Sequence, residues 1–285
     1  MVLEITHRNG KLSIPDTMIG GPRELEKLAN LILAGVKSSS EPKSEPAPKP
    51  EIKPEAPKME PQAEALLRAI REQSKTDPLV GAKIGAKEIL QRLHTGMKTE
   101  KGIHIESLLC ALGALAGYAC QANLRAQALA KSMPENAAFQ VVETTDGKQY
   151  FFGDQLNNAL VNDQYSVWSL AGGAAQHAGI KELPDINEMF KHTSSVIGSA
   201  QFGIPRTPEN HKAADTPLNY LKHMWPALFP TVKQFCPQPI EWPILYGLAI
   251  QETITQGKNI IDPALSLTMV MESAIPMSKV DLAKA

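Results

Sequence analysis

Apolar and polar residues alternate in two short segments near the start of the chain, residues 2–6 and residues 11–14. Alternation with a period of two is typical of a β-strand, and the Asn9-Gly10 pair between the segments favours a tight hairpin turn. After Pro22 the apolar positions change to helical spacing over residues 25–33. We therefore expect a small hairpin–helix module in residues 1–37.

A module of about 37 residues is below the size that usually folds alone. We expect it to dock on the rest of the chain, to pair with a second copy, or to bind another protein. Residues 38–61 follow it and contain seven prolines, four lysines and five glutamates. Such a segment buries too little apolar surface to offset its ordering entropy, so we interpret it as a flexible linker. The alternative is a proline-rich ligand for an SH3-type domain at residues 46–50.

From residue 62 onward the pattern is mainly helical. Apolar positions recur three and four residues apart in eight segments: 63–74, 83–93, 103–131, 164–178, 185–197, 218–228, 244–256 and 263–274. A shorter helix is expected to run from an N-cap at Asp154 to Val161. The Asp146-Gly147 pair, flanked by β-rich segments, predicts a second hairpin. The predicted fold class is mainly α: a helical main domain over residues 62–285 with eight or nine helices, and two short β-hairpins in the whole chain.

Two features refine the expected helical domain. Residues 108–120 form an uncharged apolar segment of 13 residues, whereas about 20 residues are needed to cross a bilayer. Small residues such as Gly113 and Gly117 recur along it at helical spacing, which predicts a buried helix that another helix approaches closely. Prolines 226, 230, 237, 239 and 243 are expected to leave an irregular segment after the 218–228 helix.

Aromatic residues and charge narrow the class of protein. All 15 aromatic residues lie between Tyr118 and Tyr246, which places the expected centre of the core in this window. The net charge of −1 argues against a broad nucleic-acid-binding surface. Between Tyr220 and Tyr246 the cations are only Lys222 and Lys233, so we interpret these aromatic residues as core rather than as a base-stacking surface.

Cysteines and motifs point to a cytoplasmic protein without a recognisable catalytic signature. Cys110, Cys120 and Cys236 have no metal-binding spacing, so we expect reduced thiols packed in the core. The first residues lack the continuous apolar run of a secretory signal, which predicts a cytoplasmic location. No Walker loop, Gly-x-Ser-x-Gly, His-Glu-x-x-His or EF-hand pattern is present. The sequence therefore predicts no cofactor and no metal site.

The expected 164–178 helix carries the first candidate site. Trp168 and Gln176 are eight residues apart and share one stripe of the helix, with His177 beside them. A wide aromatic ring next to two polar groups could line a ligand pocket. The alternative is a core tryptophan and a histidine near the helix C-terminus, where a histidine is favoured by the helix dipole.

A long loop and three isolated acids are the remaining candidates. The loop, residues 198–217, is rich in Gly, Pro, Asn and Asp and is long enough to act as a lid or binding loop. Its charged and polar residues are Arg206, Glu209, Asn210, His211, Lys212 and Asp215. The alternative is a solvated loop in which Asp215 helps to start the next helix. Glu106, Glu252 and Glu272 lie on apolar helices; they are acid/base candidates if buried, and ordinary solvent-facing residues otherwise.

Two classes of function follow from these features. The leading hypothesis is an intracellular binding or scaffold protein that uses the tethered module at residues 1–37 or a pocket in the helical body. Its expected partners are another protein or a second copy, with a small-molecule ligand as a further option and without a membrane or nucleic acid. The alternative is a hydrolase or transferase whose site lies between the 164–178 helix and the 198–217 loop. This alternative predicts a concave pocket that holds His177 or His211 with an acid in hydrogen-bond reach.

Overall fold

In the computed structural model, residues 2–7, 10–15, 61–145 and 147–284 are described. By its contacts the chain divides into two units, Met1–Lys58 and Met59–Ala285, and each is considered by itself. In the first unit β1 (Val2–His7) and β2 (Gly10–Pro15) pair antiparallel. The helix expected at residues 25–33 and nearly all of the linker expected at residues 38–61 lie outside the described residues.

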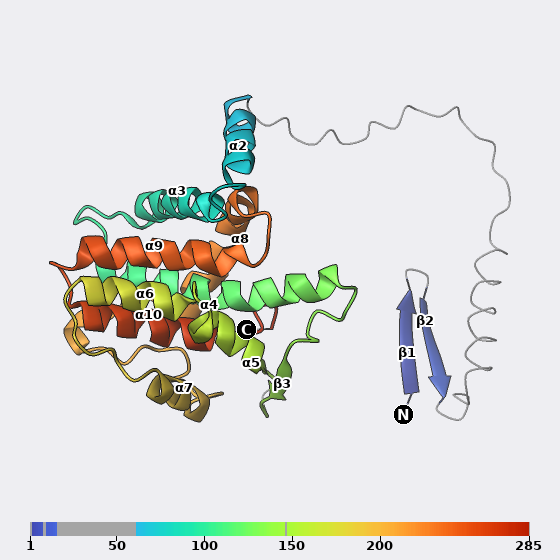
Figure 1. Cartoon of the computed structure of the whole chain (residues 1–285). Coiled ribbons are helices and arrows are strands. Elements are labelled where there is room, and N and C mark those ends of the chain that lie inside the picture. The colour runs from blue at the N-terminus through green and yellow to red at the C-terminus, as the bar shows by residue number, and fades with distance from the viewer. Residues whose placement is uncertain (1, 8–9, 16–60, 146, 285) are drawn as a thin grey trace. The chain divides into compact units, whose positions relative to one another are not determined.

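The second unit is mainly helical, as expected. Its α-helices are α2 (Pro61–Gln73), α3 (Val80–Met97), α4 (Ile105–Ala130), α5 (Asp154–Asn157), α6 (Val167–His177), α7 (Ile186–Ser195), α8 (Pro217–Phe235), α9 (Glu241–Gly257) and α10 (Pro263–Met277). In Figure 1 the axes of α3, α9, α6, α10 and α4 run in nearly the same direction. Helix α9 contacts α3, α4 and α6, and α4 contacts α8, α9 and α10. The unit is therefore a bundle of helices packed around α4 and α9.

The α4–α10 contact confirms that small residues let a second helix approach closely. A side chain at Gly117 would begin 2.0 Å from the backbone oxygen of Ala274 in α10. One at Gly113 would begin 2.5 Å from the oxygen of Val270. Helix α4 is the one helix of the described residues long and apolar enough to span a membrane, but 83% of its apolar window is buried. It is packed as the central helix of a soluble protein is packed.

The core includes the expected aromatic window and extends beyond it into α10. Helix α10 has no aromatic residue, yet all its residues from Ser266 to Met277 except Thr268 are buried. Aromatic side chains lie in more than one place: the Trp225 ring of α8 contacts Tyr118 of α4 and stacks on Phe229 at a centroid distance of 4.7 Å, and the Tyr150 ring contacts Phe202. The core thus combines aromatic residues with aliphatic and small residues in one cluster.

Helix α8 corrects one prediction. It continues through Pro226 and Pro230 to Phe235, whereas an irregular segment was expected after Leu228. A proline inside a helix loses a backbone hydrogen bond and strains the preceding turn. The same helix buries Trp225, Leu228, Val232 and Phe235 on one side, and burial of these large side chains outweighs that local cost. Pro243 lies in the first turn of α9, where a proline is tolerated.

The second predicted hairpin is confirmed, and the short helix after it is corrected. Strands β3 (Gln140–Glu143) and β4 (Gln149–Phe152) pair antiparallel. Asp154 is the first residue of α5 rather than its N-cap, because the N-cap position is held by Gly153 with φ of 146°. Helix α5 ends after one turn and continues as a π-helical turn, η2 (Asn158–Asn162). A π-turn widens the helix locally and is often found at functional sites.

Candidate functional site

A polar cavity of about 440 Å³ lies where β4, the π-turn, α7 and the end of α10 meet. Its polar lining residues are Asn157, Asn162, Asn187, Lys191, Ser194 and Lys279, joined by Thr193. Phe152, Val161, Phe190 and Ile275 complete the lining. Among these described residues there are two lysines and no carboxylate. This lining offers amide and ammonium donors.

Lys279 is the most unusual residue of this cavity. It is only 2% exposed, although lysine is almost never fully buried unless it is paired. Its ammonium nitrogen donates to Asn157 Oδ1 at 3.0 Å and lies 5.3 Å from the Phe152 ring centre and 5.7 Å from that of Phe190. No carboxylate of the described chain forms an ion pair with it. Burial consequently lowers the pKa of Lys279 from 10.5 to about 8.

The backbone on both sides of Lys279 is held in place. The side-chain amide of Gln121, which is fully buried in α4, donates to the carbonyl oxygens of Ser278 at 2.8 Å and Val280 at 3.0 Å. The backbone N–H of Phe151 in β4 donates to the carbonyl oxygen of Lys279 at 2.8 Å. Three hydrogen bonds from two distant elements therefore hold the backbone of residues 278–280 in place.

The π-turn η2 and the residue before it supply two asparagine side chains to the polar wall of the cavity. Asn157, which accepts the Lys279 hydrogen bond, is the last residue of α5 and directly precedes η2. Asn162 Nδ2 donates to Asn158 Oδ1 at 2.8 Å, so two amides of this turn are held to one another. Because the turn has one extra residue compared with an α-helix, the amide side chains of Asn157 and Asn162 both reach the cavity wall.

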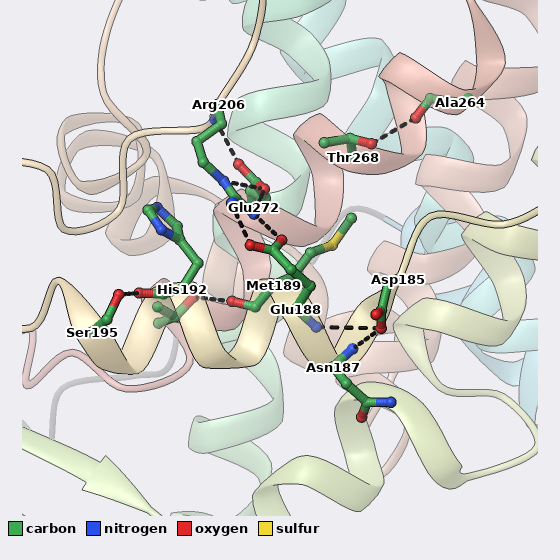
Figure 2. A network of polar contacts seen from close by, with 11 residues as sticks. Asp185, Asn187, Glu188, Met189, His192, Ser195, Arg206, Ala264, Thr268 and Glu272 are labelled. Atoms are coloured by element: carbon green, nitrogen blue, oxygen red, sulfur yellow. Dashed lines mark hydrogen bonds and ion pairs between the residues drawn. The ribbon is translucent and has the colours of Figure 1, made fainter.

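Arg206, one of the candidates in the long loop, holds together the helices beside this cavity. Its backbone N–H donates to Glu272 Oε2 at 2.6 Å and its guanidinium donates to Glu272 Oε1. The same guanidinium donates to both carboxylate oxygens of Glu188 in α7. Figure 2 shows Arg206 between these two acids. The hydrogen bonds from Arg206 lower the pKa of the Glu188 carboxyl. Glu272 is therefore buried and paired, and Arg206 ties the loop to α7 and α10.

His211 does lie within hydrogen-bond reach of an acid. Its Nδ1 is 2.8 Å from Oε1 of Glu106, which is only 8% exposed at the start of α4. The other oxygen of Glu106 is 3.3 Å from Nε2 of His104. The hydroxyl of Ser107 accepts from the N–H of Ala214 at 2.9 Å. The hydrolase or transferase alternative requires such a pair inside a concave pocket. Neither His211 nor His177 lines the polar cavity or a larger hollow between α3 and α9, and the His211–Glu106 pair holds the loop against α4.

The other loop candidates and Glu252 lie on the surface. Asp215 Oδ1 accepts from the backbone N–H of Thr216 and the side chain of Asn219, both at 2.7 Å, so it helps to start α8. Glu209 and Lys212 are exposed and pair with one another, and Asn210 is exposed. Glu252 is exposed and accepts from Gln256 Nε2 at 2.6 Å.

The stripe on α6 agrees with the alternative interpretation, a core tryptophan and a histidine near the helix C-terminus. Trp168 is half-buried and packs against the core, whereas Gln176 and His177 are exposed. His177 Nδ1 donates to the carbonyl oxygen of Gly173 at 2.7 Å, near the end of its own helix. His177 thus contacts its own helix, α6, and His211 contacts α4. No described contact joins the two histidines.

A larger hollow of about 620 Å³ lies between α3 and α9 and includes Glu252. Its other charged or titratable lining residues are Lys87, His94 and Lys98. Both lysines and Glu252 are exposed, so their charges are solvated. Lys191 of the cavity at Lys279 is exposed as well, but that cavity also holds the buried and hydrogen-bonded Lys279. Fixed and desolvated groups give a site its selectivity, so the cavity at Lys279 is the better candidate despite its smaller volume.

Sequence reasoning did not select Lys279 or Asn157. The available signal was weak: between residues 263 and 280 the charged residues are only Glu272 and Lys279, and an isolated charge in an apolar segment can equally end at the surface. The two contacting residues are 122 positions apart. Only the tertiary fold brings them together.

Comparison of the chain with protein-family models, with curated proteins and with solved structures finds no match. Its function must therefore be argued from the chemistry of the site. The three cysteines are free and buried, as expected, and burial raises the pKa of the Cys110 and Cys120 thiols to about 12. Within residues 61–145 and 147–284 and the two N-terminal strands, no group of three or more His, Cys, Asp or Glu side chains is placed to hold a metal ion.

Proposed function

We propose that this protein is a binding protein for a small anionic molecule, which it holds in the cavity at Lys279. The observation that carries the proposal is a buried ammonium group that lines a cavity without a carboxylate partner among the described residues. A buried cation without a counter-charge is costly. An anionic ligand would supply the missing charge.

The cavity also limits the size and shape of the ligand. Its volume of about 440 Å³ falls within the range of small-molecule sites. Lys279 and Lys191 offer positive charge to a carboxylate or phosphate, and the Phe152 and Phe190 rings offer an apolar surface. The side-chain amides of Asn157 and Asn162 add hydrogen-bonding groups. A small organic anion with one apolar or planar part fits this combination best.

Matched probes test the charge preference. Benzoate, benzyl alcohol and benzylamine have similar shapes and differ in charge; each is titrated calorimetrically into the full chain at constant ionic strength. Benzoate is expected to bind more tightly than the other two. Lys279→Met should weaken benzoate binding by about 10- to 100-fold, because a hydrogen bond to a charged group contributes about 1.5–3 kcal/mol.

Lys222→Met is the matched control, since it removes the same charge from an exposed position of α8. It should leave benzoate affinity within twofold of the natural chain. The proposal fails if benzylamine binds as tightly as benzoate, or if the two lysine variants behave alike.

We further propose that residues 1–37 bind a protein partner or a second copy of the chain in the cytoplasm. The paired strands β1 and β2 support an organised segment there, and the free buried thiols support a reducing compartment. A tether of about 24 residues would raise the effective concentration of this second contact. Unchanged capture of every partner after deletion of residues 1–37 would contradict this role.

A further inference from the structure

The amine of Lys279 has the features of a nucleophile as well as those of an anion-binding group. It lines the cavity, its one described hydrogen-bond acceptor is Asn157 Oδ1, and no acid holds its proton through an ion pair. An ammonium has three N–H groups. A single neutral acceptor and two ring faces therefore stabilise the charged form less than water does.

Burial changes how much free amine is present near neutral pH. With a pKa of about 8, roughly a quarter of Lys279 is unprotonated at pH 7.5, compared with about 0.1% of an ordinary lysine. The nearby Cys120 thiol, whose pKa is raised to about 12 by its own burial, stays protonated and does not compete as a thiolate. Lys191 adds a second positive charge to the lining.

We propose that Lys279 Nζ forms an imine with an aldehyde or ketone group of an anionic ligand bound in this cavity. The proposal rests on the proposed function, because the anionic group of the ligand positions its carbonyl group. In its free-amine form Lys279 is the nucleophile, so the anionic group faces Lys191 and the cavity amides while the carbonyl group faces Lys279 Nζ. In the reaction the nitrogen lone pair attacks the carbonyl carbon and a C–N bond forms. The carbonyl oxygen then leaves as water with the two hydrogens of the amine, and the C=N bond remains. No oxidant or reductant is consumed.

The geometry favours this lysine over those on the surface. Its backbone is held by Gln121 and Phe151, and its amine is held in the cavity by the hydrogen bond to Asn157 Oδ1. The Phe152 and Phe190 rings flank the amine and limit the access of water. Fixed position, a high fraction of free amine and a nearby anion site together increase the rate of attack on a bound carbonyl group.

The test uses 4-carboxybenzaldehyde, which is benzoate with an aldehyde group, and benzaldehyde as the uncharged control. The full chain is incubated with each probe at pH 7.5, the imine is reduced with borohydride, and labelled lysines are located by peptide mass spectrometry. We expect Lys279 to be labelled by the anionic aldehyde at least tenfold faster than the exposed Lys222. Benzoate should slow this labelling, and benzaldehyde should label Lys279 more slowly than its carboxylated counterpart.

Variants separate the imine from simple anion binding. Lys279→Arg keeps a positive charge but cannot form an imine, so it should lose labelling at this position and retain measurable benzoate binding. Lys279→Met should lose both. The comparison of Lys279 with Lys222 within the natural chain needs no variant, so it stands even if Arg does not fit the buried position.

The possible outcomes distinguish the two proposals. Benzoate binding that depends on Lys279, with Lys279 labelled no faster than Lys222, would overturn the imine and leave the proposed function intact. Absence of both binding and labelling would overturn both proposals. Rapid labelling that benzoate does not slow would show a reactive amine outside an anion site, which also contradicts this inference.

Discussion

At the scale of single residues, Lys279 should make the folded state less stable than it would be with an apolar side chain. Its charged form is disfavoured by burial, so its pKa falls from 10.5 to about 8 in the folded protein. Well below pH 8 both the folded and the unfolded chain hold the proton, and the whole desolvation cost is present. Between pH 8 and 10.5 the folded state releases the proton first, so the unfolded state binds more protons and the free energy of unfolding rises with pH.

Titration of Lys279 is therefore predicted to make the free energy of unfolding depend on pH. A pKa change of this size corresponds to about 3 kcal/mol. As the pH rises from 8 to 10.5, the free energy of unfolding of the natural chain should increase by about this amount relative to that of Lys279→Met. Urea denaturation at several pH values measures it, and other titrating groups cancel in the difference. A difference that stays constant with pH would mean that Lys279 is not desolvated.

At the scale of elements, the small residues of α4 decide how closely α10 can lie. Gly117→Ala places a methyl group against the backbone of Ala274, and overpacking of this kind costs about 1–3 kcal/mol. Gly173→Ala in α6 adds the same methyl group where no atom lies within 4 Å, so it should gain up to about 1 kcal/mol from helix propensity. Thermal unfolding of the two variants measures the contrast. Equal effects would contradict the close contact between α4 and α10.

The elements also show which features the sequence can predict. The sequence located α4 to within two residues at either end, since its apolar and small residues continue along most of the helix and residues 106–117 are all buried. It failed at α8, where Pro226 and Pro230 are locally unfavourable and the benefit comes from packing against other helices. It also missed the π-turn after α5, because one inserted residue leaves no periodic signal.

The candidate site was less predictable than the helices for a related reason. Arg206 and Glu272 were each recognisable as candidates, but their pairing is between residues 66 positions apart. Lys279 acquires its unusual environment from α4, β4, the π-turn and α7 together. A single isolated lysine in a sequence does not indicate whether four distant elements will surround it.

At the scale of the whole molecule, the unit Met59–Ala285 has a hydrophobic core of its own, formed by residues between Leu67 and Val280. The unit Met59–Ala285 should therefore fold without the first 58 residues. Deletion of residues 1–58 is expected to change the melting temperature of this unit by less than about 2 °C, which for its size corresponds to under 1 kcal/mol. Scanning calorimetry of both chains measures this. A decrease of several degrees would show that the N-terminal segment docks on the helical body in the same chain.

The Arg206 contacts join the long loop to α7, which lines the cavity, so closure of the loop and binding of a ligand are expected to be linked. Glu188, which Arg206 holds, belongs to α7, and α7 also supplies Asn187, Phe190 and Lys191 to the cavity wall. If closure of the loop steadies that wall and so favours the ligand, then the ligand must favour closure of the loop by the same free energy. Ligand binding in the cavity would then slow hydrogen exchange of the Arg206 backbone N–H, which donates to Glu272.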